Sequence, residues 1–140
     1  MNLEKYQQYS RIARGLEKAD LVLKDARIVN VFTEEIIRGD IAIQDGIIAG
    51  IGSFHGKEER DLAGRYVCPG FFVSRLPPGS TLVTPAELVT AASRHGTTTF
   101  IVDPHESANV SGLAGIDYIL DQTEDVKANV YVMMPSCVPA

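Results

Sequence analysis

The chain has 140 residues, of which 45% are hydrophobic and 22% charged, so it is typical of a globular protein rather than a disordered one. A complete (β/α)8 barrel usually takes about 250 residues, which is more than this chain offers. The net charge is −5 and no long basic run is present. This argues against a nucleic-acid partner or an anionic membrane surface, because both need clustered Lys and Arg.

The sequence contains neither a membrane span, nor a signal peptide, nor a paired cysteine motif. No apolar run approaches the roughly 20 residues of a membrane span, and residues 1–9 lack the charged-then-apolar layout of a signal peptide. We therefore expect a cytoplasmic protein that binds neither membrane nor nucleic acid. Cys68 and Cys137 form no paired motif, so we expect buried, reduced thiols rather than a zinc site or a disulfide.

The first half of the chain is predicted to be an N-terminal helix followed by short strands. Residues 3–18 carry an imperfect 3.6-residue apolar stripe, which indicates a surface helix that ends near Asp20. β-branched residues then predict two strands, residues 21–23 and 26–32, with Lys24 and Asp25 as a turn between them.

A hairpin is predicted next, because Asp45-Gly46 lies between apolar runs and Gly accepts the positive φ of a primed turn. Residues 52–60 are polar and are interpreted as a solvated loop. A strand from Asp61 or Tyr66 to Phe72 is expected to complete a meander and to lead into a Pro/Gly-rich bend.

In the second half, helices and strands alternate, as in a parallel α/β sheet. Thr84 and Glu87 have the spacing of a capping box, which predicts a helix from there to about Arg94. A buried strand is expected over residues 97–102. Then follow a polar link, a helix near residues 112–122 and a last strand over residues 128–134.

Ligands of parallel sheets bind at the carboxyl ends of strands, which here are residues 73–80, 103–106 and 135–139. Of these, only Asp103-Pro104-His105-Glu106 groups a His with two carboxylates, the side chains that bind Zn, Mn or Fe or act as general acid and base. The alternative is that Asp103 caps the following turn while His105 and Glu106 face solvent.

Several separated motifs resemble a known family. The segments 19–32, 39–43, 48–52 and 69–71 resemble the opening of amidohydrolase-superfamily enzymes. More narrowly, residues 83–87, 95–99, 103–110 and 135–140 resemble the adenine deaminase family of bacteria.

The resemblance implies an α/β fold: a helix over residues 1–18, the β-sandwich strands of a composite domain over 19–68, and the first βα units of a metal-dependent-hydrolase (TIM-type) barrel over 69–140, with the barrel incomplete. It also implies the family reaction, in which metal-activated water converts adenine to hypoxanthine and ammonia. The family cofactor would be a divalent metal, Mn, Fe or Zn.

The chain departs from the family where the metal is held. After Pro-Gly-Phe the family places an Asp, a His-x-His pair and a Glu; aligned without gaps, this chain has Val73, Arg75, Pro77 and Gly79 at those four positions. Arg cannot lose its proton in a protein, and Pro and Gly have no donor side chain.

His105 and Glu106 are then left as candidate metal ligands, with Asp103 as support at the site face. No residue is assigned a catalytic role, and we expect no metal on this chain. An anion site built on Arg75 is the alternative to a solvated surface charge.

We therefore expect an adenine deaminase-like piece that is truncated and inactive by itself. The alternative is a non-catalytic pseudoenzyme, or a subunit that pairs its open sheet with a second copy or another polypeptide. A third reading is an active amidohydrolase in which Asp103, His105 and Glu106 share a metal with ligands from a partner chain.

Overall fold

The structure, a computed structural model, describes residues 3–135. It consists of two compact units, Met1–Pro69 (unit 1) and Gly70–Ala140 (unit 2), which are described separately. Unit 1 contains α1 (Leu3–Ala13), β1 (Ala19–Asn30), β2 (Glu35–Gln44), β3 (Ile47–Gly52), β4 (Gly56–Asp61) and β5 (Tyr66–Val67). Unit 2 contains β6 (Phe71–Leu76), the 3-10 helix η1 (Pro78–Thr81), α2 (Pro85–Ser93), β7 (Thr97–Val102), α3 (His105–Ser111), α4 (Leu113–Thr123) and β8 (Asn129–Val132).

Unit 1 is a mixed sheet with the order β3-β2-β1-β4, in which β5 also pairs with β1. β2 runs antiparallel to β1 and β3, whereas β4 and β5 run parallel to β1. The predicted meander is therefore wrong. Alternating apolar residues identify an extended segment, but they do not identify the strand with which it pairs.

β1 is one long strand, so the predicted turn at Lys24 and Asp25 is wrong. The register with β2 shifts between Leu23 and Ala26, and Asp25 has a φ of 50°. This is a β-bulge, which bends a strand without ending it. Asp40 stabilises the bulge, because its carboxylate accepts hydrogen bonds from Lys24 Nζ and from the amide of Asp25.

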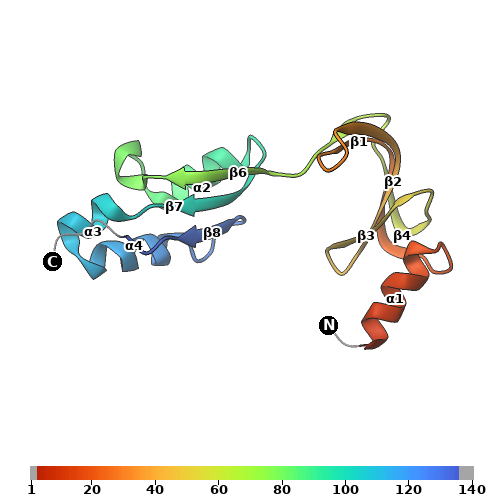
Figure 1. Cartoon of the computed structure of the whole chain (residues 1–140), viewed down its shortest axis with the longest axis horizontal. Helices are drawn as coiled ribbons and strands as arrows, with labels where there is room; N and C mark the ends of the chain where they lie inside the picture. The colour runs from red at the N-terminus through yellow and green to blue at the C-terminus, as the bar shows by residue number, and fades with distance from the viewer. Residues whose placement is uncertain (1–2, 136–140) are drawn as a thin grey trace. The chain divides into compact units, whose positions relative to one another are not determined.

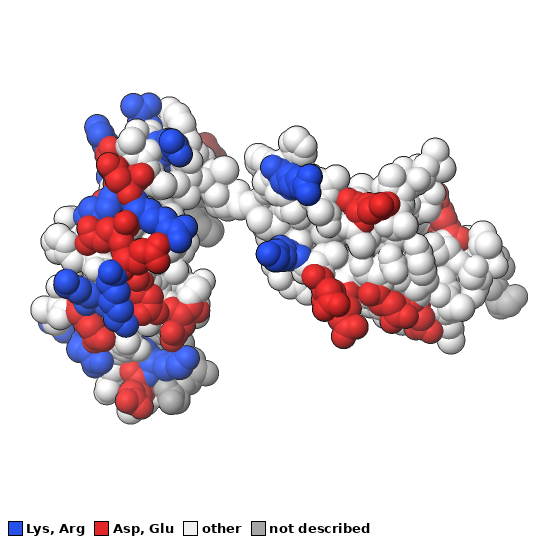
Figure 2. Space-filling model, turned by 180° about the vertical axis from the view of Figure 1, so that it is seen from behind, with Lys and Arg blue, Asp and Glu red and all other residues white. Residues whose placement is uncertain are grey.

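The Asp45-Gly46 hairpin is confirmed, since these residues join β2 to β3 with φ values of 51° and 75°. The predicted loop over residues 52–60 is wrong, because β4 begins at Gly56 within it. β4 has exposed charged side chains after Gly56, as expected of a sheet edge that is protected from further pairing. Figure 2 shows acidic and basic side chains interleaved over unit 1.

Helix α1 packs on this sheet, but it ends at Ala13 and not near Asp20. Only its Ile12 is buried, in a cluster with Ala19, Val22, Ala42 and Phe54. Within residues 3–135 no helix has the length and apolar character needed to cross a membrane.

Unit 2 is a three-stranded sheet with the order β6-β7-β8, and both strand pairs are parallel (Figure 1). The predicted α/β alternation is therefore confirmed. Helices α2 and α4 cover one face through a buried cluster that contains Val89, Phe100, Val102 and Ile119.

The helix boundaries of unit 2 are partly as predicted. Thr84 caps α2, and its Oγ accepts a hydrogen bond from the amide of Glu87. The polar link expected after Glu106 is wrong, because α3 spans His105–Ser111 and is separated from α4 only by Gly112, whose φ is 61°.

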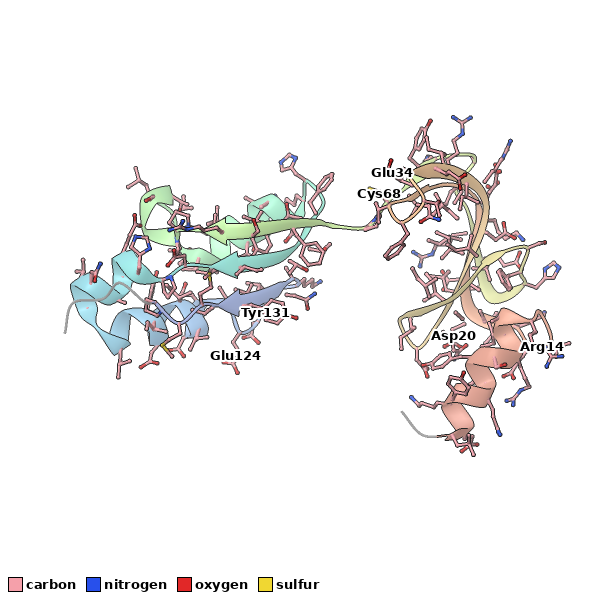
Figure 3. All side chains as sticks on the ribbon, viewed as in Figure 1. Arg14, Asp20, Glu34, Cys68, Glu124 and Tyr131 are labelled. Carbon is pink, nitrogen blue, oxygen red and sulfur yellow. The ribbon has the colours of Figure 1, made fainter. Side chains whose placement is uncertain are left out.

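The junction between the units also differs from the prediction. The expected strand 66–72 is divided into β5 and β6, so the bend lies at residues 68–70 and Arg75 lies within a strand. A Cβ on Gly70 would lie 2.1 Å from Thr98 Oγ1, so only glycine fits where β6 begins. Cys68 is exposed in this bend rather than buried (Figure 3), and Cys137 lies outside the described residues.

Candidate functional site

The parallel pairing of β6 with β7 brings two predicted site residues together. Leu76 pairs with Val102, and the amide of Asp103 donates a 2.9 Å hydrogen bond to the carbonyl of Leu76. Arg75, near the end of β6, and Asp103, directly after β7, therefore lie at the same carboxyl edge of the sheet. This is the edge where parallel sheets place their functional groups.

The carboxylate of Asp103 lies at the centre of a polar cluster, between the side chains of Arg75 and His105. Its Oδ2 lies 3.2 Å from Arg75 Nε, and its Oδ1 lies 3.0 Å from His105 Nδ1. The amide of His105 also donates to Oδ1 over 3.3 Å. The side chain of Asp103 is 12% exposed, whereas that of Arg75 is 73% exposed. Asp103 thus caps the following turn, as one of the two readings predicted, but His105 is only 27% exposed and does not face solvent freely.

These contacts favour the ionised form of Asp103. The ring of His105, then its amide and, more weakly, Arg75 lower the pKa of the carboxyl group below its ordinary value, although burial opposes them. The carboxylate is therefore a charged group that is held in place by its neighbours.

Glu106 makes a different set of contacts, to η1. Its Oε1 accepts a 2.6 Å hydrogen bond from Ser80 Oγ, while Oε2 is buried and has no hydrogen-bond partner among the described residues. A Cβ on Gly79 would lie 2.5 Å from Oε2. Glu106 therefore fills the space that the missing side chain of Gly79 leaves open.

Next to this contact lies a groove of about 610 Å³. It is lined by Gly79, Ser80, Glu106, Ser107, Val110, Ser111, Ala114, Gly115 and Tyr118. Arg75, Asp103 and His105 are not among the lining residues. The residues of the Asp103–Glu106 motif are thus divided between two sites: Asp103 and His105 lie with Arg75, whereas Glu106 contacts Ser80.

The residues at this edge do not fit a divalent metal. Arg75 carries a permanent positive charge, and Pro77 and Gly79 offer no side-chain donor. Both oxygens of Asp103 already face cationic or N–H groups. Within residues 3–135, no three His, Cys, Asp or Glu side chains gather in a way that could hold a metal ion.

Two contacts were not predicted from the sequence. One is the hydrogen bond between Ser80 and Glu106, and the other is the ion pair between Arg75 and Asp103. The sequence did contain an indication of the ion pair between Arg75 and Asp103, because both residues lie at the ends of neighbouring strands in the predicted parallel sheet. The third predicted strand end, residues 135–139, lies outside the described residues except for Pro135.

Comparison with known proteins gives a consistent result. No family model matches the chain. An adenine deaminase of Desulfitobacterium hafniense is 54% identical over all 140 residues, which are 25% of that protein. An adenine deaminase 2 of Desulfotalea psychrophila is 47% identical over the whole chain and 24% of its own length, and an adenine deaminase of Clostridium acetobutylicum is 51% identical over 91% of the chain and 22% of its own length. The chain thus spans about a quarter of the length of the curated relatives it matches.

Proposed function

We propose that this chain, which is homologous over its whole length to an N-terminal portion of adenine deaminases, is part of an adenine deaminase-like amidohydrolase. The family reaction is the hydrolysis of adenine: a bond forms between a ring carbon and the oxygen of water, the bond to the amino group breaks, and hypoxanthine and ammonia leave.

The architecture of unit 2 supports this proposal. Three parallel strands with helices on one face are what the first βα units of a (β/α)8 barrel would provide. The opposite face carries exposed aromatic side chains: Phe72 of β6 is 69% exposed, and Tyr131 of β8, labelled in Figure 3, is 60% exposed. Further strands would cover that face in a closed barrel. The mixed sheet of unit 1 would contribute strands to a composite β-sandwich.

We further propose that the chain does not deaminate adenine by itself. The observation that carries this point is the ion pair between Arg75 and Asp103, which places a fixed cation at the edge where the family holds its metal. No step through a metal is assigned to these residues, because they do not fit one.

A chimera tests both parts of the proposal. In the Desulfitobacterium hafniense enzyme, the matching segment is replaced by this chain, and hypoxanthine and ammonia are measured with Mn, Fe or Zn supplied. We expect no turnover from this chimera. We expect turnover to return when it carries Val73→Asp, Arg75→His, Pro77→His and Gly79→Glu together.

The parent enzyme is the control. Turnover by the unsubstituted chimera at the rate of the parent would contradict the proposed loss of activity. A fourfold-substituted chimera that folds and binds metal but stays inactive would contradict the deaminase proposal.

A second candidate function is that of a non-catalytic subunit that pairs with a second copy or another chain. It is favoured by the exposed aromatic residues of the unit 2 sheet, since uncovered apolar surface often marks an interface. Light scattering coupled to size exclusion, over a range of concentrations, would show a dimer that Phe72→Ser together with Tyr131→Ser dissociates. A folded monomer at every concentration would count against self-pairing.

A further inference from the structure

We infer that the guanidinium of Arg75 acts as a built-in cation at the carboxyl edge of unit 2 and neutralises Asp103 in place of a metal. This inference goes beyond the proposed function, and its test uses metal binding and stability rather than turnover. If the deaminase proposal fails, the inference about Arg75 still holds. If the inference about Arg75 fails, the deaminase proposal still holds.

The charge of Asp103 requires a partner. Its carboxylate is largely withdrawn from water, and a buried charge is costly unless it is paired and hydrogen-bonded. Arg75 provides a charge that no change of pH within the ordinary range removes. The amide of His105 donates a hydrogen bond to Oδ1, and the ring Nδ1 of His105 lies 3.0 Å from the same oxygen, so both carboxylate oxygens have protein partners.

The same contacts oppose a divalent cation. Transition metals bind carboxylate oxygens at about 2.0–2.2 Å. An ion bound to Oδ2 of Asp103 would therefore lie at most about 5.4 Å from Arg75 Nε, given the 3.2 Å between that nitrogen and Oδ2. Like charges at such a distance repel strongly near a protein surface.

Glu106 does not offset the repulsion between Arg75 and a metal ion at this edge. Its carboxylate is engaged by Ser80 and packs against Gly79, so it lies with η1 rather than with the cluster around Asp103. Asp103 and His105 are then the only metal-binding types of side chain in the cluster. A third metal ligand would have to come from position 75, which is an Arg.

The test compares Arg75→Met, which removes the charge but keeps most of the stem, with Arg94→Met. Arg94 is exposed in the same unit and makes no ion pair among the described residues. Thermal unfolding is followed with excess EDTA and with equimolar Zn²⁺ or Mn²⁺. We expect the unfolding midpoint of the unsubstituted chain to be the same with chelator and with metal, and Arg75→Met to lower the midpoint by a few degrees more than Arg94→Met.

A gain-of-function variant completes the experiment. Arg75→His places an imidazole beside Asp103 and His105, so it should acquire Zn²⁺ binding by titration calorimetry that EDTA reverses and that His105→Gln removes. The inference is overturned if the unsubstituted chain binds one Zn²⁺ or Mn²⁺ in a manner that His105→Gln removes. It is also overturned if Arg75→Met is as stable as Arg94→Met.

Discussion

Gly79 packs against Glu106 so closely that a Cβ at position 79 would lie 2.5 Å from Oε2 and 3.2 Å from Cβ of Glu106. The other oxygen of the same carboxylate accepts a hydrogen bond from Ser80, the next residue. The first turn of α3 is thereby fixed to η1. Glu106, from the start of α3, therefore occupies the space that a side chain at position 79 would need.

A double-mutant cycle tests this contact. Gly79→Ala should destabilise the chain by about 1–2 kcal/mol, because the added methyl group displaces Glu106 and weakens its bond to Ser80. In a Glu106→Ala background the same substitution should cost close to nothing. Urea unfolding measures all four variants, and equal costs in the two backgrounds would show that the residues do not interact.

The N-cap of α2 is a second target. Thr84→Ala should lower the free energy of unfolding by about 1 kcal/mol, because the amide of Glu87 loses its acceptor. Thr84→Ser keeps a hydroxyl group and should restore most of this loss. Denaturant unfolding monitored by circular dichroism checks the prediction, and a Ser variant as unstable as the Ala variant would argue against capping.

The core of unit 2 depends on Ile119, which joins α4 to the sheet and is 1% exposed. Ile119→Ala should cost about 2–5 kcal/mol through lost burial and the cavity it leaves. Leu113→Ala is the matched control, since Leu113 lies on the same helix and is 77% exposed. Its cost should stay within about 0.5 kcal/mol. Similar costs for the two variants would contradict the described packing of α4.

Acid should weaken unit 1 through Asp40. Burial raises the pKa of this carboxyl group, but hydrogen bonds from Lys24 Nζ and the amides of Asp25 and Phe54 outweigh it and lower the pKa below the ordinary 3.8. Ionised Asp40 therefore stabilises the fold at any pH above the pKa that this group has in the unfolded chain. This stabilisation is lost as the pH falls through the lower pKa that the group has in the folded chain.

Asp40→Asn should accordingly be less stable near neutral pH and should lose less stability on acidification than the unsubstituted chain. Glu34→Gln, at an exposed turn position without an ion pair among the described residues, is the control. Urea midpoints measured from neutral pH to below pH 3.8 check the prediction. Parallel acid profiles for Asp40→Asn and the unsubstituted chain would refute it.

Local chemistry was readable from the sequence wherever it depends on neighbours in the chain. The Asp45-Gly46 hairpin, the cap at Thr84 and the buried strand at residues 97–102 were predicted because turn geometry, capping and β-branching act over a few residues. The bulge at Asp25 was misread as a turn, since the same residue types accept positive φ in both.

The sequence by itself determined the family, the α/β alternation of the second half and the absence of metal-binding side chains at Arg75, Pro77 and Gly79. Only the tertiary structure decided that β4 and β5 pair with β1, that Arg75 contacts Asp103, and that Glu106 turns to Ser80. Composition and local propensity are properties of single residues and their neighbours. The pairings and contacts just named join residues that are 26 or more positions apart, and which of them meet is fixed by how the strands align.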